Sequence, residues 1–200
     1  MSELEYGLPA YLEPVIGFRS RKAAQLCALF ATSSRGCIEK LKLIKLVYLT
    51  ERRHLATYED TMLMDELFSL RNGPICSGTL NGINGEIHQE IWDDYLARNG
   101  NLIVALKSFS RDDLDELSND EVDIANQIWE EFKGMTASQI RNFTHQNCPE
   151  YTEVDSGRLP IRYQDVLSAV GSSDANAIDA DIMSLRRAEQ VLTHAGRQRD

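Results

Sequence analysis

The sequence predicts a mainly α fold: a compact, single-domain helical protein with one minor short β element. Three observations predict it. Apolar residues recur at helical spacing in most segments between turn signals. Two capping boxes, Ser118 to Glu121 and Thr136 to Gln139, stand where two such segments begin. One short apolar run, residues 102–106, is bounded by turn residues as a strand would be.

The first part of the chain predicts two long helices. Residues 18–33 carry an apolar stripe at helical spacing, with Ser20 as the N-cap and Gly36 as the left-handed residue that follows. Residues 38–58 contain the run LKLIKLVYL, which a strand could also explain. The length of the segment and its few β-branched residues favour a helix.

The middle of the chain combines turns, a helix and the strand. Residues 71–78, RNGPICSG, are predicted to reverse the chain, because Asn-Gly forms tight turns and proline fixes φ. Residues 86–98 are predicted to form a helix that ends at Asn99 and Gly100. The strand, LIVAL, follows at residues 102–106.

The last part of the chain predicts three more helices. The two capping boxes open helices that end at Gly134 and near Asn147, because Pro149 disfavours helix at the residue before it. The final helix begins at Asp174, with its acidic residues early and its arginines late, as the helix dipole favours. Its apolar residues fall on one face.

Composition and charge exclude several classes of protein. The chain has 200 residues, 42% apolar and 26% charged, which suits one globular domain. Its net charge is −10, whereas a domain that binds nucleic acid is usually basic, so we expect none to be bound by this chain alone. No segment predicts a secretory signal or a membrane span, so we expect a cytoplasmic protein without a membrane partner. No Cys or His lies at metal-ligand spacing, so we expect no metal and no cofactor.

The residues that could carry catalysis are better explained by structural roles. Residues 71–78 resemble a phosphate loop but lack the lysine that must follow the last glycine, and Cys76 has no base nearby in sequence. His145, after Thr144, could be a general base, but capping or burial is favoured. Asp112, Asp113, Asp115 and Glu116 form an acidic run in a predicted loop, so solvation is favoured over acid–base work or magnesium binding. We therefore expect that the chain is not an enzyme.

A basic strip on the second helix is the candidate binding surface. Lys42, Lys45 and Tyr48 follow one another at spacings of three, and Arg52 and Arg53 lie farther along the same helix. The strip could contact an acidic partner or a nucleotide. A solvated edge beside the core is the favoured alternative, because charged faces usually meet solvent.

Several segments together resemble one family. RKAAQLCALFA, KLKLIKLVYLTERRHL, DELFSLRNGPICSGTL, LSNDEVDIANQIWEEFKGMTASQI and THQNCPEY occur in the order and spacing of the Panacea domain of SocA-like antitoxins. The resemblance runs from Phe18 to Tyr151, with Ile75 where valine is usual and Tyr151 where tryptophan is common. The motif residues expected to be structural are Lys22, Gly73, Pro74, Ser118, Glu121, Thr144 and His145.

The resemblance implies a domain organisation and a function. It divides the chain into an N-terminal extension (1–17), a Panacea-like antitoxin domain (18–155) and a C-terminal helical extension (156–200) packed on the same domain. It implies an antitoxin of a bacterial or phage toxin–antitoxin system that neutralises a co-encoded toxin by direct contact. The basic strip, with Lys42, Lys45, Tyr48, Arg52 and Arg53, or the final helix would bind the toxin.

Two alternatives stay open. The chain could be an adaptor that delivers the toxin to a protease, or an enzyme that reverses the toxin's modification. The expected partner is therefore the cognate toxin, and in the adaptor alternative also a protease. The chain is expected to form a heterocomplex or a homo-oligomer. An acidic antitoxin would suit a toxin with a basic surface, because opposite charges speed association.

Overall fold

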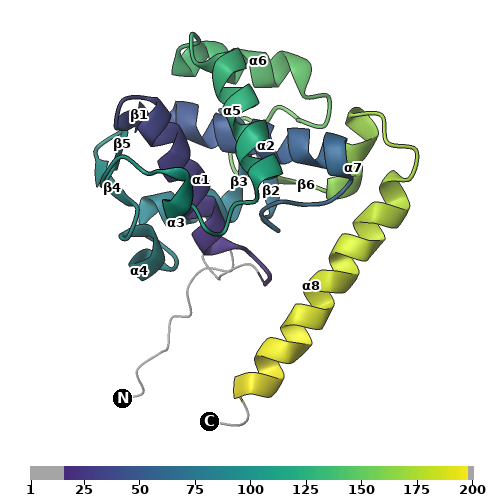
Figure 1. The fold of residues 1–200 in the computed structure, drawn as a ribbon. Helices are drawn as coiled ribbons and strands as arrows, with labels where there is room; N and C mark the ends of the chain where they lie inside the picture. Colours follow the sequence, from purple (N-terminus) through teal and green to yellow (C-terminus); the bar gives the residue numbers. More distant parts are fainter. Residues whose placement is uncertain (1–15, 198–200) are drawn as a thin grey trace, which may run out of the picture.

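Two long helices form the centre of the molecule. The structure, a computed structural model, describes residues 16–197. Helices α1 (Ser20–Ser33) and α2 (Lys40–Tyr58) cross in the middle, and α5 (Asn119–Phe132) and α6 (Ala137–Asn147) cover one side of α2 (Figure 1). The remaining helices are α3 (Ser77–Asn84), α4 (Gln89–Trp92), α7 (Tyr163–Ala169), α8 (Ala175–Arg197) and the 3-10 turn η1 (Arg111–Asp113).

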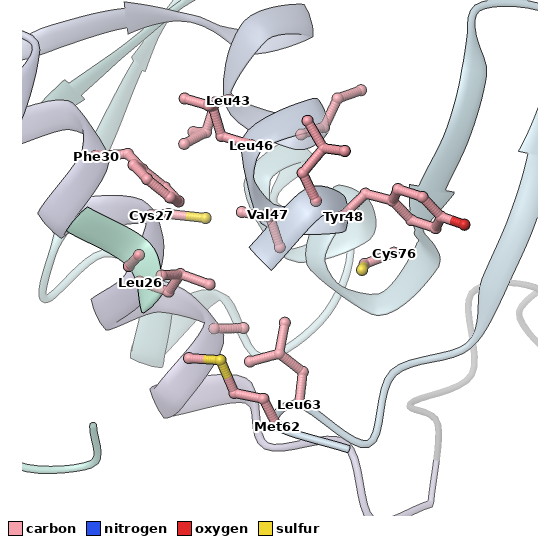
Figure 2. Close-up of a cluster of buried hydrophobic side chains, with 14 of the residues drawn as sticks. Leu26, Cys27, Phe30, Leu43, Leu46, Val47, Tyr48, Met62, Leu63 and Cys76 are labelled. Atoms are coloured by element: carbon pink, nitrogen blue, oxygen red, sulfur yellow. The ribbon is translucent and has the colours of Figure 1, made fainter. Parts of the chain in front are cut away.

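The core lies where the apolar stripes of α1 and α2 meet. Figure 2 shows Leu26, Cys27 and Phe30 of α1 together with Leu43, Leu46, Val47 and Tyr48 of α2. Phe30 and Leu46 have 0% of their side chains exposed, and Met62 and Leu63 extend the same cluster. Burying a side chain of this size contributes roughly 1.5–3 kcal/mol, so this contact holds the two helices together.

Two antiparallel sheets of three strands each flank the helices. One has the order β1 (Cys37–Glu39), β5 (Leu102–Ala105), β4 (Leu96–Asn99), and the other β3 (Gly73–Cys76), β2 (Leu67–Leu70), β6 (Leu159–Ile161). The predicted strand is confirmed as β5. The fold is mainly helical as predicted, but its β content exceeds the single short element that the sequence suggests.

The predicted chain reversal at residues 71–78 is confirmed. Leu70 pairs with Gly73, so Arg71 and Asn72 form the two-residue turn of the β2–β3 hairpin. Gly73 has φ +95°, a conformation that side chains rarely adopt. Sequence alone did not reveal that Gly73–Cys76 continues as a strand.

The helix predicted over residues 86–98 is wrong. Only Gln89–Trp92 is helical, and Leu96–Asn99 is strand β4. Asn99 and Gly100 stop no helix: Asn99 ends β4 and pairs with Leu102, and Gly100, at φ 61°, forms with Asn101 the turn that joins β4 to β5. Pairing with β5, which also pairs with β1, outweighs the local preference for helix.

Some helices start where a local capping box predicts, and others start where contacts with distant residues place them. Both capping boxes form as predicted, and they open α5 and α6. Ser20 is not the N-cap of α1, because Arg19 precedes the helix and the Ser20 hydroxyl accepts a hydrogen bond from Trp92 Nε1 at 3.1 Å. Helix α2 starts at Lys40, since Ile38 pairs with Ile103 in the first sheet.

Helix α8 runs along one side of the molecule and extends past the body (Figure 1). Near its middle Ile182 is 2% exposed, and Arg186 Nη2 donates to the carbonyls of Met64 (2.8 Å) and Asp65 (2.6 Å). These contacts attach α8 to the body. Within residues 16–197 no helix combines the length and the apolar character that crossing a bilayer requires.

Candidate functional site

The motif residues of three separate segments meet beside the β2–β3 hairpin. Lys45 Nζ donates to the Pro74 carbonyl at 2.7 Å. A Cβ atom on Gly73 would lie 3.0 Å from Lys45 Nζ, from Thr144 Oγ1 and from His145 Cδ2. Glycine is therefore required both by φ and by space. We call Lys45, Gly73, Pro74, Thr144 and His145 the hairpin junction.

The amine of Lys45 is enclosed by the junction. The side chain is 0% exposed, and burial lowers its pKa to about 7, against weaker opposing effects of Cys148 and Cys76. A lysine in this position holds the hairpin carbonyl against α2. It cannot touch a partner protein unless the hairpin moves.

His145 packs the end of α6 onto the same hairpin. Its ring lies 4.5 Å from the ring of Tyr151, centroid to centroid, and Tyr151 Oη donates to the Leu70 carbonyl at 3.1 Å. Burial, then the charges of Lys45 and Arg141, lower the pKa of His145, which favours the neutral ring. The ring is partly buried and lies in a packed contact with Tyr151.

The thiols near the junction are protonated and therefore unreactive as nucleophiles at neutral pH. Cys76 is 1% exposed, and burial raises its pKa well above the ordinary value. Burial likewise raises the pKa of Cys148 to about 12. A thiol attacks as the thiolate, so neither side chain is in its reactive form at neutral pH.

The middle of the basic strip holds the segment that follows α6. Tyr48 Oη and Arg52 Nε both donate to Glu150 Oε1, at 2.8 Å and 2.7 Å. The Glu150 side chain is 0% exposed and that of Arg52 is 21% exposed. The two residues thereby bind Glu150 to α2, about 100 positions away along the chain.

One end of the strip contacts the segment that follows α5, and the other end contacts α5 itself. Lys42 Nζ donates to the carbonyls of Lys133 (2.8 Å) and Met135 (2.7 Å). Arg53 Nη2 pairs with Glu131 Oε2 at 2.9 Å, and both side chains keep more than a third of their surface exposed.

The expectation of a solvated edge is therefore wrong for two residues of the strip. Lys45 and Tyr48 are 0% and 1% exposed. The face that carries them packs against α6 and the hairpin. Among the strip residues only Lys42, Arg52 and Arg53 retain exposed surface, and the Arg53 side chain is more exposed than that of Arg52. Nothing in the local pattern could identify the distant partners that bury this face.

The remaining motif residues have structural contacts. Lys22 Nζ pairs with Glu121 Oε1 at 2.7 Å, and Glu121 Oε2 also accepts from the Ser118 backbone N–H. The same carboxylate therefore caps α5 and ties it to α1. In the acidic run, Asp113 is held by Lys107 and Ser110. Within the described part of the chain, no cluster of His, Cys, Asp and Glu has an arrangement that could hold a metal.

Helix α8 carries a second candidate surface. Leu185, Val191 and Leu192 are 51%, 68% and 71% exposed. Leu185 and Leu192 are seven residues apart, so they share one side of the helix, and Val191 lies about 100° around the helix axis from Leu192. We call these three residues the outer flank of α8. The sequence shows one apolar face on this helix, whereas the structure buries Ile182 and leaves the outer flank in solvent.

One of three comparisons with known proteins gave a match. Searches of curated proteins and of solved structures gave no match. A family model described as "Antitoxin SocA-like, Panacea domain" matches residues 43–150, more than half of the chain. The matched range contains the whole hairpin junction and ends at Glu150, the residue that anchors to Tyr48 and Arg52. The chain therefore belongs to the SocA-like antitoxin family and carries its Panacea domain.

Proposed function

We propose that the protein is an antitoxin that neutralises a co-encoded toxin by direct, stoichiometric binding through the outer flank of α8. Family membership supports a role in toxin–antitoxin systems in general. The binding mode rests on one observation: Leu185, Val191 and Leu192 stand 51–71% exposed on a helix attached to the body.

The physical reason is the cost of leaving such side chains in water. Each large aliphatic side chain transferred from water into an interface contributes about 1.5–3 kcal/mol. Ile182 and Arg186, about 60° and about 100° around the helix axis from Leu185, attach α8 to the body. The outer flank is therefore presented on a pre-formed helix, as in complexes where an amphipathic helix lies in an apolar groove of its partner.

Charge favours a basic toxin. The chain carries 31 acidic and 21 basic residues, so its long-range field attracts a positively charged protein and accelerates the encounter. In this proposal the antitoxin acts in the cytoplasm and turns over no substrate. Neutralisation then requires at least one antitoxin per toxin.

The test uses the protein encoded by the neighbouring reading frame. Titration calorimetry compares its binding to the wild type and to the Leu185→Ser/Leu192→Ser variant. A matched control is Leu102→Ser/Leu106→Ser, because Leu102 and Leu106 are also exposed, at 40% and 52%. We expect the α8 variant to bind on the order of 100-fold more weakly and the control to bind within about twofold of wild type.

Further measurements on the same proteins separate the alternatives. Rescue by far less than one antitoxin per toxin would support an enzyme, and accelerated loss of toxin in a pulse-chase would support a protease adaptor. If the α8 variant binds the toxin normally but converts a dimer of the wild type into monomers, a second copy of this chain occupies the outer flank. Each of these outcomes overturns the proposal as stated.

A further inference from the structure

A pocket of about 510 Å³ opens between the start of α2 and the β2–β3 hairpin. Its apolar wall includes Leu41 and Ile44 of α2 and Leu80 of α3. Gly73 also lines it, so the pocket borders the hairpin junction. We call it the hairpin pocket. Its volume lies within the range of about 300–1,000 Å³ that is typical of ligand pockets.

The rim of the hairpin pocket is more basic than the chain as a whole. Lys40 and Arg71 line it, and Glu39 is the acidic residue among its lining. Arg71 is exposed and makes no hydrogen bond or ion pair with any residue in the described range 16–197. Glu39 is the N-cap residue of α2, and the first turn of the helix adds no further acidic residue to offset the two basic side chains. This local surplus of positive charge lies on a chain of net charge −10.

We infer that the hairpin pocket receives an apolar side chain of the toxin with a carboxylate beside it. This inference rests on the proposed function and adds a second contact to it. The wall formed by Leu41, Ile44 and Leu80 would cover the apolar group. Arg71 would pair with the carboxylate through its planar fork of N–H donors, a geometry that lysine lacks.

The two kinds of charge have separate tasks in this arrangement. The net negative charge attracts a basic toxin over long distances, but it does not select an orientation. A basic rim around an apolar pocket selects one, because an acidic residue of the toxin is favoured there and disfavoured over the rest of the surface. An apolar anchor in a pocket with a polar rim is also the usual form of a binding hot spot.

The test measures toxin binding to three variants by titration calorimetry at about 50 mM and 500 mM salt. Arg71→Glu reverses the rim charge, and Leu80→Trp fills the pocket. The matched control, Arg35→Glu, makes the same change of net charge at an exposed arginine outside the pocket. We expect Arg71→Glu to weaken binding at least about tenfold at low salt and much less at high salt, because salt screens exposed charges. Leu80→Trp should weaken binding at least about tenfold at both, and Arg35→Glu should stay within about twofold of wild type.

The outcomes distinguish this inference from the proposed function. If the wild type binds and both pocket variants bind equally well, the pocket inference is overturned and the antitoxin function stands. If the wild type does not bind the toxin at all, the proposed function fails, and the pocket inference fails with it. Should Leu80→Trp fail to fold, Arg71→Glu decides alone, since Arg71 is exposed and its loss removes no internal contact.

Discussion

Helices α2 and α8 are both long, yet α2 buries charged residues whereas α8 exposes apolar ones. Helix α2 buries Lys45 and Glu51 completely and gives most of its basic residues partners within the chain. Helix α8 leaves Leu185, Val191 and Leu192 in solvent. Charged residues of α2 contact other parts of the fold, whereas apolar residues of α8 stay exposed, where we propose that the toxin binds. The polarity of a residue is therefore a poor guide to whether it faces the core.

The difference comes from what surrounds each helix. Helix α2 is enclosed by α1, α5, α6 and the hairpin, and their backbone and side-chain groups satisfy its polar atoms. Glu51, for example, accepts from the hydroxyl of Thr61 and from the Leu63 N–H at 3.1 Å. The contacts of α8 are mostly with α7, and Arg186 reaches the body from its middle. Mutations in the two helices should therefore act on different properties.

The largest effect is expected where α1 packs on α2. Phe30→Ala removes a ring that is 0% exposed and leaves a cavity against Leu46. We expect the free energy of unfolding to fall by about 3–5 kcal/mol, which urea denaturation measures. A loss below about 1 kcal/mol would contradict the view that this contact is the centre of the core.

The second effect depends on pH. Burial raises the pKa of Glu51 to about 7. Because this exceeds the ordinary value of 4.5, the contribution of Glu51 to stability is present at acidic pH and is lost as pH rises through 7. Glu51→Gln should remove that loss. The decrease in the free energy of unfolding from pH 5 to pH 8 should then be smaller than in the wild type by about 2 kcal/mol. Urea denaturation at both pH values measures it, and the fall that remains belongs to groups such as Asp65, whose pKa burial raises to about 6. An unchanged pH profile would show that Glu51 titrates normally.

The third effect tests the anchor between α2 and the segment after α6. Glu150→Gln removes the charge that Arg52 and Tyr48 contact. We expect the free energy of unfolding to fall by about 1–2 kcal/mol. Glu130→Gln is the matched control, because the Glu130–Lys133 pair is more than half exposed. It should change stability by less than about 0.5 kcal/mol. Equal effects of the two variants would mean that burial does not strengthen the first pair.

The smallest effect on stability is expected on α8. Leu185→Ser/Leu192→Ser should change the free energy of unfolding by less than about 0.5 kcal/mol, because both side chains are mostly in water in the isolated chain. The same urea measurement applies. A loss comparable to that of Phe30→Ala would show that the outer flank is covered within the free protein.

Local sequence signals predicted much of the architecture. The capping boxes at Ser118 and Thr136, the turn before Gly73 and the strand at residues 102–106 all depend on a few neighbouring residues, and all are confirmed. The helix expected over residues 86–98 failed because β4 is held by strand pairing rather than by its own preference. The motif residues were identified from the resemblance, but their meeting at the hairpin junction was not.

The sequence by itself determined the family, the helical class, the starts of α5 and α6 and the turn of the β2–β3 hairpin, since caps and turns are satisfied within a few residues. Tertiary structure alone decided which charged residues are buried. Lys22 finds Glu121 and Tyr48 finds Glu150 across 99 and 102 positions. It also divided the apolar face of α8 into a packed and an exposed part. The physical reason is that the burial of a helix face depends on which distant segment packs against it, and the local spacing of residues does not determine that segment.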